Sequence, residues 1–151
     1  MSEFKEMLAP LLKVLYPNRC EICGTVIEVD ATRCEECQSL PVIELPRCYS
    51  CGAAKDKCKC DKHRHEYKRV LAPYYYEGRI KLAIANLKRN DMPFLARNMA
   101  EEIAKCVNEE YADIDFDCIT FVPMTRRDRI KRGYNQSQLL AESLSEQLGI
   151  P

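Results

Sequence analysis

The 151-residue sequence lacks a long hydrophobic run and lacks an excess of charge of either sign. No stretch reaches the roughly 20 consecutive apolar residues that a membrane-spanning helix needs, so we expect no membrane insertion. The 23 basic and 23 acidic residues give a formal net charge of +0. Because the chain as a whole is not attracted to nucleic acid, any such binding depends on local basic patches.

A signal peptide is also missing, which favours reduced thiols over disulfides. The thiols are numerous: of the ten cysteines, eight lie between positions 20 and 60, in four closely spaced pairs. The pairs are Cys20 and Cys23, Cys34 and Cys37, Cys48 and Cys51, and Cys58 and Cys60. Two such turns supply the four thiolates of a closed zinc site, so the pattern predicts two structural Zn²⁺ ions. A full thiolate shell leaves no position for water or substrate, and we assign no catalytic residue.

The order of the pairs indicates which cysteines share an ion. Gly24 and Gly52 directly follow the first and third pairs, where the chain must turn through positive φ. This repeat predicts one ribbon that begins at Cys20 and another at Cys48, each holding one ion with four successive cysteines. A crossed pairing is the alternative, and ligand spacing alone does not separate zinc from iron.

The metal is expected to shape the predicted double zinc ribbon at 17–66. Apolar residues in this segment, including those of short strands expected at 26–29 and 42–45, are too few for a self-sufficient core, so metal binding must supply folding free energy. Eight thiolates and two zinc ions take the formal net charge from +0 to about −4, which neighbouring arginines can offset locally. His63 and His65 follow the last pair and are expected to be solvated rather than ligands.

The flanking segments are predicted to be helices and strands. Residues 1–16 have apolar residues at helical spacing and predict an amphipathic helix that packs on its own domain. Beyond residue 67 the pattern predicts strands at 70–76 and 118–122, and helices at 79–88, from near Pro93 to about 107, and at 136–148. Asn135 is the expected N-cap of the last helix and Gly149 its end, while Cys106 and Cys118 are expected in the core.

A strand, a basic loop at 123–134 and a helix in succession are typical of a doubly wound α/β sheet, in which ligands bind at the carboxyl ends of strands. The basic side chains of this loop and the helix start behind it suit a phosphate or pyrophosphate group, although a solvated basic turn explains them equally well. The expected fold is therefore α+β overall, with a double zinc ribbon followed by an incomplete, Rossmann-like α/β domain at 67–151.

Several short strings resemble the ComF family of bacterial competence proteins. They are Leu12 to Gly24, Tyr75 to Gly78, Leu87-Lys88, Val122 to Met124, and Arg-Gly-Tyr-Asn-Gln-Ser at 132–137. The resemblance implies an N-terminal double zinc ribbon and a C-terminal domain like type I phosphoribosyltransferases. It also implies a cytoplasmic protein of DNA uptake in natural transformation, with a competence helicase or another DNA-uptake protein as a partner.

For the site, the resemblance implies binding of phosphoribosyl pyrophosphate (PRPP), with Mg²⁺, in a full-length relative. The corresponding phosphate-binding candidates here are Arg127, Arg129, Arg132, Gly133, Asn135 and Gln136. Asp128 stands where family members carry an arginine, four residues before the Arg-Gly pair. The acidic strand end and Thr-Thr-Gly-like loop of these transferases are absent, so we expect this chain alone to be inactive and to be the N-terminal part of a longer protein. The apolar edge of an unfinished sheet predicts self-association.

The alternative function is a zinc-ribbon module that binds single-stranded nucleic acid or docks a partner of the competence machinery. Its phosphate contacts would come from the basic stretch around the last cysteines, namely Lys57, Lys59, Lys62, Arg64 and Lys68. Tyr74, Tyr75 and Tyr76 offer faces for base stacking. Against this, tyrosines in a strand are more often part of a core or a sheet surface.

Overall fold

The structure, a computed structural model, describes residues 15–60, 66–89 and 92–151. In these ranges the helices are α2 (Glu35–Gln38), α3 (Gly78–Arg89), α4 (Leu95–Glu110), α5 (Arg126–Arg132) and α6 (Gln136–Leu148). The N-terminal helix predicted at 1–16 falls almost entirely outside the described residues, as do His63 and His65. No helix of the described part has the length and apolar character to span a membrane.

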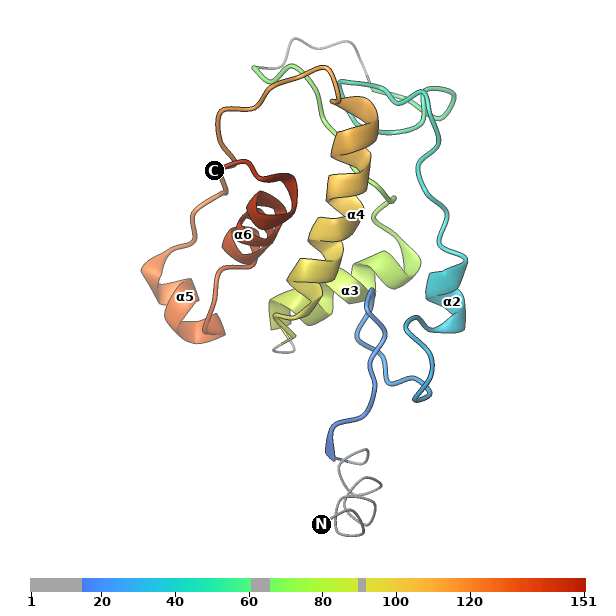
Figure 1. Cartoon of the computed structure of the whole chain (residues 1–151), viewed down its shortest axis with the longest axis vertical. Coiled ribbons are helices and arrows are strands. Elements are labelled where there is room, and N and C mark those ends of the chain that lie inside the picture. The colour runs from blue at the N-terminus through green and yellow to red at the C-terminus, as the bar shows by residue number, and fades with distance from the viewer. Residues whose placement is uncertain (1–14, 61–65, 90–91) are drawn as a thin grey trace.

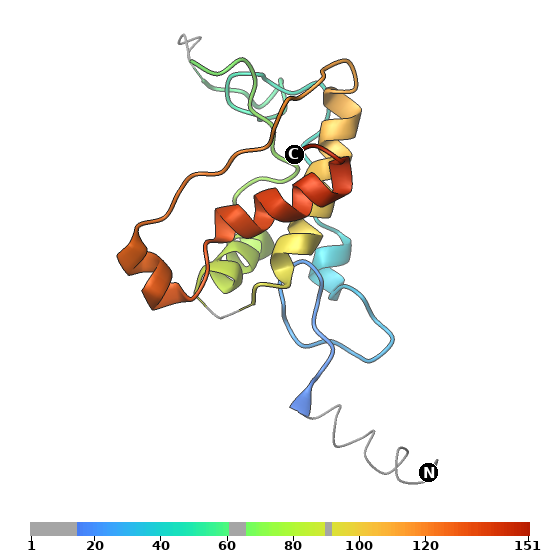
Figure 2. The same cartoon turned by 60° about the vertical axis from the view of Figure 1, so that its left-hand side comes forward.

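Helix α4 is the axis of the molecule. Its 16 residues extend over about 24 Å, and α6 packs against it (Figures 1 and 2). Helix α3 lies near the N-terminal end of α4 (Figure 1). The chain of the first four cysteines lies at that same end, while the chain of the last four lies at the C-terminal end of α4 (Figure 1). The helix therefore separates the two cysteine groups.

Helix α6 has the bounds that the sequence predicts. The Asn135 side chain accepts a hydrogen bond from the backbone N–H of Ser137 at 3.1 Å, which satisfies one of the free donors at the helix start. At the other end Gly149 takes a left-handed conformation with φ of 67° and donates its N–H to the carbonyl of Ser145. Both cap predictions are confirmed.

The predicted strands are wrong for the described chain. In place of strands at 26–29, 42–45, 70–76 and 118–122, the structure has isolated antiparallel bridges: Arg19 with Val26, Val42 with Tyr74, and Arg47 with Ala54. The segment 118–122 is extended, but no neighbouring strand covers it, so Val122 is 76% exposed and Cys118 is exposed rather than in the core. An apolar run becomes a strand only where a second strand satisfies its backbone groups. Cys106, in contrast, is buried as predicted.

The basic loop expected at 123–134 contains a short helix, α5. The Thr125 side chain accepts a hydrogen bond from the Asp128 backbone N–H, and its hydroxyl donates to the Asp128 carboxylate at 2.8 Å. Thr-x-x-Asp is a capping pattern of the kind that starts helices. The prediction of a loop at 123–134 overlooked this signal for α5. Gly133, at φ of 82°, ends the helix. Asp128 therefore has a local structural role at the position where the ComF pattern has an arginine.

The interior consists of two small clusters. The first joins cysteines of the first ribbon to α3 and contains Cys20, Ile22, Cys23, Cys37 and Ala83. The second lies where α3, α4 and α6 meet, and contains Leu87, Leu95 and Ala96 with Leu139 and Leu140 packed against it. Leu95 is fully buried and is the largest such side chain among the described residues. It anchors the helical half of the molecule.

We therefore expect Leu95→Ala to lower the free energy of unfolding of the metal-loaded protein by about 2–5 kcal/mol, because it leaves a cavity that the helices cannot close. The neighbouring Phe94 is 44% exposed, and Phe94→Ala is expected to cost less than about 1 kcal/mol. Urea unfolding followed by circular dichroism measures both values. Equal losses in the two variants would show that the second cluster is not a core.

Candidate metal centres

The structure brings the eight cysteines into two groups of four successive residues. One group is Cys20, Cys23, Cys34 and Cys37, and the other is Cys48, Cys51, Cys58 and Cys60; within each, the sulfurs all lie within 4.8 Å of one another. This is the sequential grouping that the glycine repeat predicts, not the crossed one. None of these eight cysteines forms a disulfide.

The sulfur separations suit a tetrahedral ion. Four sulfurs at about 2.3 Å from a zinc ion lie about 3.8 Å from one another. The Sγ atoms of Cys23 and Cys34 are 3.7 Å apart, and those of Cys51 and Cys58 are also 3.7 Å apart. The pair Cys58 and Cys60 is tighter, at 3.2 Å. Both groups can hold a structural Zn²⁺, whose role would be to cross-link the chain.

The two ribbons repeat the same turn at their first knuckle. Gly24 and Gly52 have φ of 74° and 75°, as predicted. Gly24 donates its N–H to the carbonyl of Cys20 at 2.8 Å, and Gly52 donates to that of Cys48 at 2.7 Å. A side chain at either glycine would strain this turn, since L residues rarely adopt positive φ. The turn is what directs the two sulfurs of each knuckle to one point.

The first cysteine of each ribbon has a thiol with a lowered pKa, which favours metal binding. Burial raises the pKa of the Cys20 thiol, but backbone N–H groups, that of Cys23 first, outweigh it and bring the pKa from 9.0 to about 7. For Cys48, a hydrogen bond with the Cys58 thiol and backbone N–H groups lower the pKa to about 6. Thiolate is the form that binds zinc, so each ribbon offers one ligand that is readily deprotonated near neutral pH.

The two groups differ in burial. Cys20 and Cys23 are 0% exposed and Cys37 is 1% exposed, and they pack against Ala83 of α3. In the second group Cys51 is exposed, and the other three are only partly buried. The first site therefore lies in the interior, and the second lies at the surface.

Polar contacts fix the first ribbon to the helices. The side-chain amide of Asn86, buried in α3, donates to the carbonyl of Cys23 at 2.6 Å. Asn98 of α4 donates to the carbonyl of Glu21 at 2.9 Å. Both side chains donate to backbone carbonyls of the ribbon: Asn86 to that of the ligand Cys23, and Asn98 to that of Glu21, next to the ligand Cys20. The first metal site and the helix pair are thus one packed unit.

The second ribbon is fixed to the C-terminal end of α4. The Arg47 side chain, 2% exposed, forms an ion pair with Glu110 and donates through Nε to the carbonyl of Ile43 at 3.0 Å. Arg69 donates to the carbonyl of Glu110 at 3.3 Å and lies over the ring of Tyr49, 4.6 Å from its centroid. Two arginines therefore converge on the last residue of the helix, where the helix dipole favours positive charge.

Glu102 in the middle of α4 joins three segments. Its carboxylate accepts hydrogen bonds from Arg33 at 2.9 Å, Lys105 at 2.8 Å and the Tyr74 hydroxyl at 2.5 Å. Burial raises the pKa of Glu102, but these donors outweigh it and hold the pKa below its ordinary value. For Tyr74, burial and the bond to Glu102 raise the pKa. Tyr74 is thus a structural residue rather than an open stacking face.

The phosphate-binding candidates divide into two sets. Arg127, Arg129, Arg132 and Gly133 lie exposed on or just after α5, and Arg129 lines an open hollow of about 600 Å³. Asn135 and Gln136 are both buried to 6% exposure. Asn135 is occupied as the cap of α6 and donates to the carbonyl of Val122 at 3.4 Å. The structure therefore does not bring the six together on one surface.

The nucleic-acid candidates are described in part. Lys57, Lys59 and Lys68 are exposed, whereas Lys62 and Arg64 lie outside the described residues. Tyr76 is 64% exposed. The Tyr75 hydroxyl accepts from the Ala54 N–H at 3.2 Å, so it is engaged within the ribbon.

Asn86, Asn98 and Glu102 hold the metal-bearing ribbon in place and were not among the residues predicted from the sequence. The sequence does contain a signal for Asn86. Asn86 falls on the same helical face as Ala83 and Leu87, and a polar residue on an apolar face indicates a buried hydrogen bond. Asn98 and Glu102 gave no such signal, because their partners are distant in sequence.

Residues 11–67 match the double zinc ribbon domain family. Neither the curated proteins nor the solved structures gave a significant match. The chain thus carries a double zinc ribbon domain with two four-cysteine groups, consistent with two structural zinc ions. A mostly helical region follows this domain.

The difference in burial predicts two rates of metal loss. We expect the purified protein to contain two zinc ions, and a strong chelator to remove the exposed one roughly tenfold faster or more, because the buried one is released only when the core opens. A zinc-sensitive dye measures the two phases. Cys51→Ser should remove the fast phase, whereas Cys37→Ser should remove the slow phase and the cooperative unfolding transition. A single phase releasing both ions, or loss of the slow phase in Cys51→Ser, would contradict this order.

Proposed function

We propose that this is a ComF-like protein of the cytoplasm, in which the double zinc ribbon is joined to a phosphoribosyltransferase-related fold and serves DNA uptake. One hydrogen bond supports the related fold most directly. The backbone N–H of Ile119, in the extended segment 118–122, donates to the carbonyl of Pro151 at 2.7 Å. Segment 118–122, helix α6 and Pro151 beside Ile119 follow one another in the order of a β-α-β unit, although the described residues form no strand pair here.

In this arrangement α5 has a role in ligand binding. In a β-α-β unit the ligand lies beyond the carboxyl end of the strand, and α5 follows that end here. Arg126 and Arg129 both line the hollow beside Gly133. Guanidinium groups form bidentate, charge-assisted hydrogen bonds with phosphate oxygens. We therefore propose that this hollow binds a pyrophosphate group. The chain itself is not expected to transfer a phosphoribosyl group.

We expect magnesium pyrophosphate to bind at low ionic strength and Arg129→Ala to weaken that binding about threefold to tenfold, the range of one exposed charge-assisted hydrogen bond. Isothermal titration calorimetry measures the affinity. Arg97→Ala is the matched control, since Arg97 is an exposed arginine of α4 outside the hollow. Absence of binding, or the same decrease in both variants, would reject the site.

A second candidate function is binding of single-stranded DNA by the second ribbon. The specific observation is that Lys57, Lys59 and Lys68 are exposed on or next to this ribbon, close in sequence to the exposed ring of Tyr67. Lysines neutralise phosphates, and an aromatic ring stacks on a base without regard to sequence. Thiolate-bound zinc adds negative charge to the ribbon, so these lysines would carry the attraction.

We expect a labelled oligothymidine to bind with an affinity that falls with salt. Replacing the three lysines by glutamine should flatten the plot of log affinity against log salt by about 2, because each neutralised phosphate of a single strand contributes roughly 0.7 to the slope. Fluorescence anisotropy gives the slope. A control variant with Arg126, Arg127 and Lys131 of α5 replaced by glutamine removes the same charge elsewhere and should keep the slope. An unchanged slope in the ribbon variant would exclude this function.

A further inference from the structure

A cavity of about 300 Å³ lies between α3, α4 and α6. The segment 72–74 and Ile22 of the first ribbon complete its wall. No cysteine and no residue of α5 lines it, and nothing in the proposed function uses it. Ile22 and Ala83, which belong to the buried cluster of the first metal site, also line the cavity, so it lies next to that packed unit.

The wall of this cavity is mostly apolar. The aliphatic part comes from all three helices, with Ile84, Met99, Ile103 and Leu140 among its residues. Two of its polar side chains, Tyr74 and Glu102, are hydrogen-bonded to each other. A water molecule needs two to four polar partners, so a wall of this kind favours an apolar occupant over solvent.

One polar group of the wall is not satisfied. Gln136, the first residue of α6, lines the cavity and is only 6% exposed. Its Nε2 is buried and has no hydrogen-bond partner among the described residues. Its Oε1 accepts a long bond of 3.5 Å from Arg132, which leaves the amide nitrogen as the free end. A buried donor without an acceptor costs free energy, and an acceptor placed in the cavity would recover it.

We infer that this cavity binds a small, neutral, largely apolar molecule that carries one hydrogen-bond acceptor, to which the Gln136 Nε2 group donates. The size follows from the volume: a cavity of about 150 Å³ lined by aliphatic residues holds benzene, so twice that volume holds two fused rings. The neutrality follows from the buried part of the wall, because a charged ligand would lose its hydration there without gaining a buried partner of opposite charge; Lys88, which also lines the cavity, is an exposed side chain. Glu102 is already engaged by three donors.

A pair of probes tests the inference. Quinoline and naphthalene have the same fused-ring shape, but only quinoline has a ring nitrogen that accepts a hydrogen bond. With the zinc-loaded protein we expect quinoline to bind about fivefold more tightly, the effect of one neutral hydrogen bond. Nitrogen-15 NMR measures both affinities and should show the largest side-chain amide shift at Gln136.

Three variants separate the contribution of the Gln136 hydrogen bond to probe binding from that of the apolar cavity. Gln136→Leu should abolish the preference for quinoline, while Gln138→Leu should retain it, because Gln138 does not line the cavity and is bonded to Glu142. Ile84→Phe should fill the cavity and weaken both probes at least tenfold. Circular dichroism and zinc content verify that each variant is folded. The inference is overturned if neither probe binds saturably, if the two bind equally to the unaltered protein, or if the preference survives in Gln136→Leu.

Discussion

The packing of cysteine sulfur against a helix is the interaction on which the rest of this structure depends. Among the largest fully buried side chains are Leu95 and the three ligands Cys20, Cys23 and Cys37. A domain of this size normally fills that position with leucine or phenylalanine. Here the first four-thiolate group occupies it, and Ala83 is small enough to let the ribbon approach α3. Metal binding and core formation are therefore the same event at this site.

The arginines beside the ligands act differently from what the sequence suggested. Arg19 donates to the carbonyl of Gly24 at 3.0 Å, Arg33 to Glu102, and Arg47 to Glu110 and Ile43. Each uses its guanidinium to fasten a loop or a helix rather than to face the thiolates. The charge of the nearby arginines still offsets that of a zinc–thiolate site, but Arg19 braces the first ribbon internally, while Arg33 and Arg47 join the ribbons to α4. This explains why one helix can hold two metal sites at its two ends.

The sequence predicted what is encoded within short stretches and missed what depends on distant partners. The cysteine grouping, the positive φ of Gly24 and Gly52, and both ends of α6 are set by a few adjacent residues, and the predictions for them are confirmed. The predicted strand at 118–122 is wrong here, because extended structure needs a neighbour that local pattern does not supply. The cavity beside Gln136 was not predictable, since residues as distant in sequence as Ile22 and Leu140 line it.

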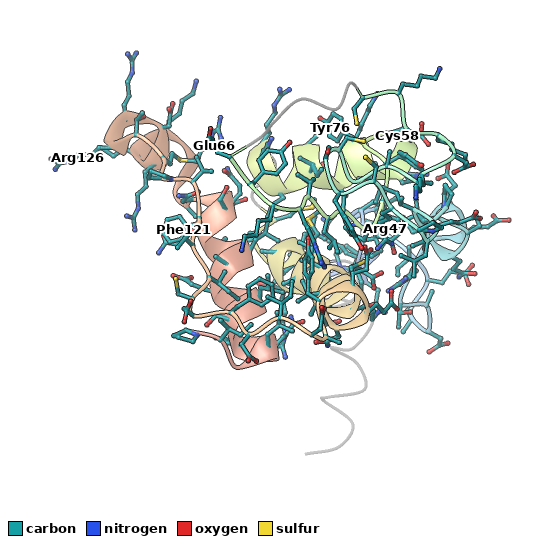
Figure 3. All side chains as sticks on the ribbon, turned by 90° about the horizontal axis from the view of Figure 1, so that it is seen from above. Arg47, Cys58, Glu66, Tyr76, Phe121 and Arg126 are labelled. Carbon is teal, nitrogen blue, oxygen red and sulfur yellow. The ribbon has the colours of Figure 1, made fainter. Side chains whose placement is uncertain are left out.

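The two basic regions lie on different parts of the molecule, and this limits how they can act. Arg126 of α5 and Cys58 of the second ribbon lie far apart in Figure 3. A single phosphate group cannot contact both, because the reach of two side chains is much shorter than a molecule of this size. Only a long single strand could reach both, and the exposed acidic residue Glu66 lies between them in the view of Figure 3, where it would repel the phosphates of such a strand. The regions are therefore best regarded as independent, with α5 suited to a compact anion and the ribbon to a flexible polyanion.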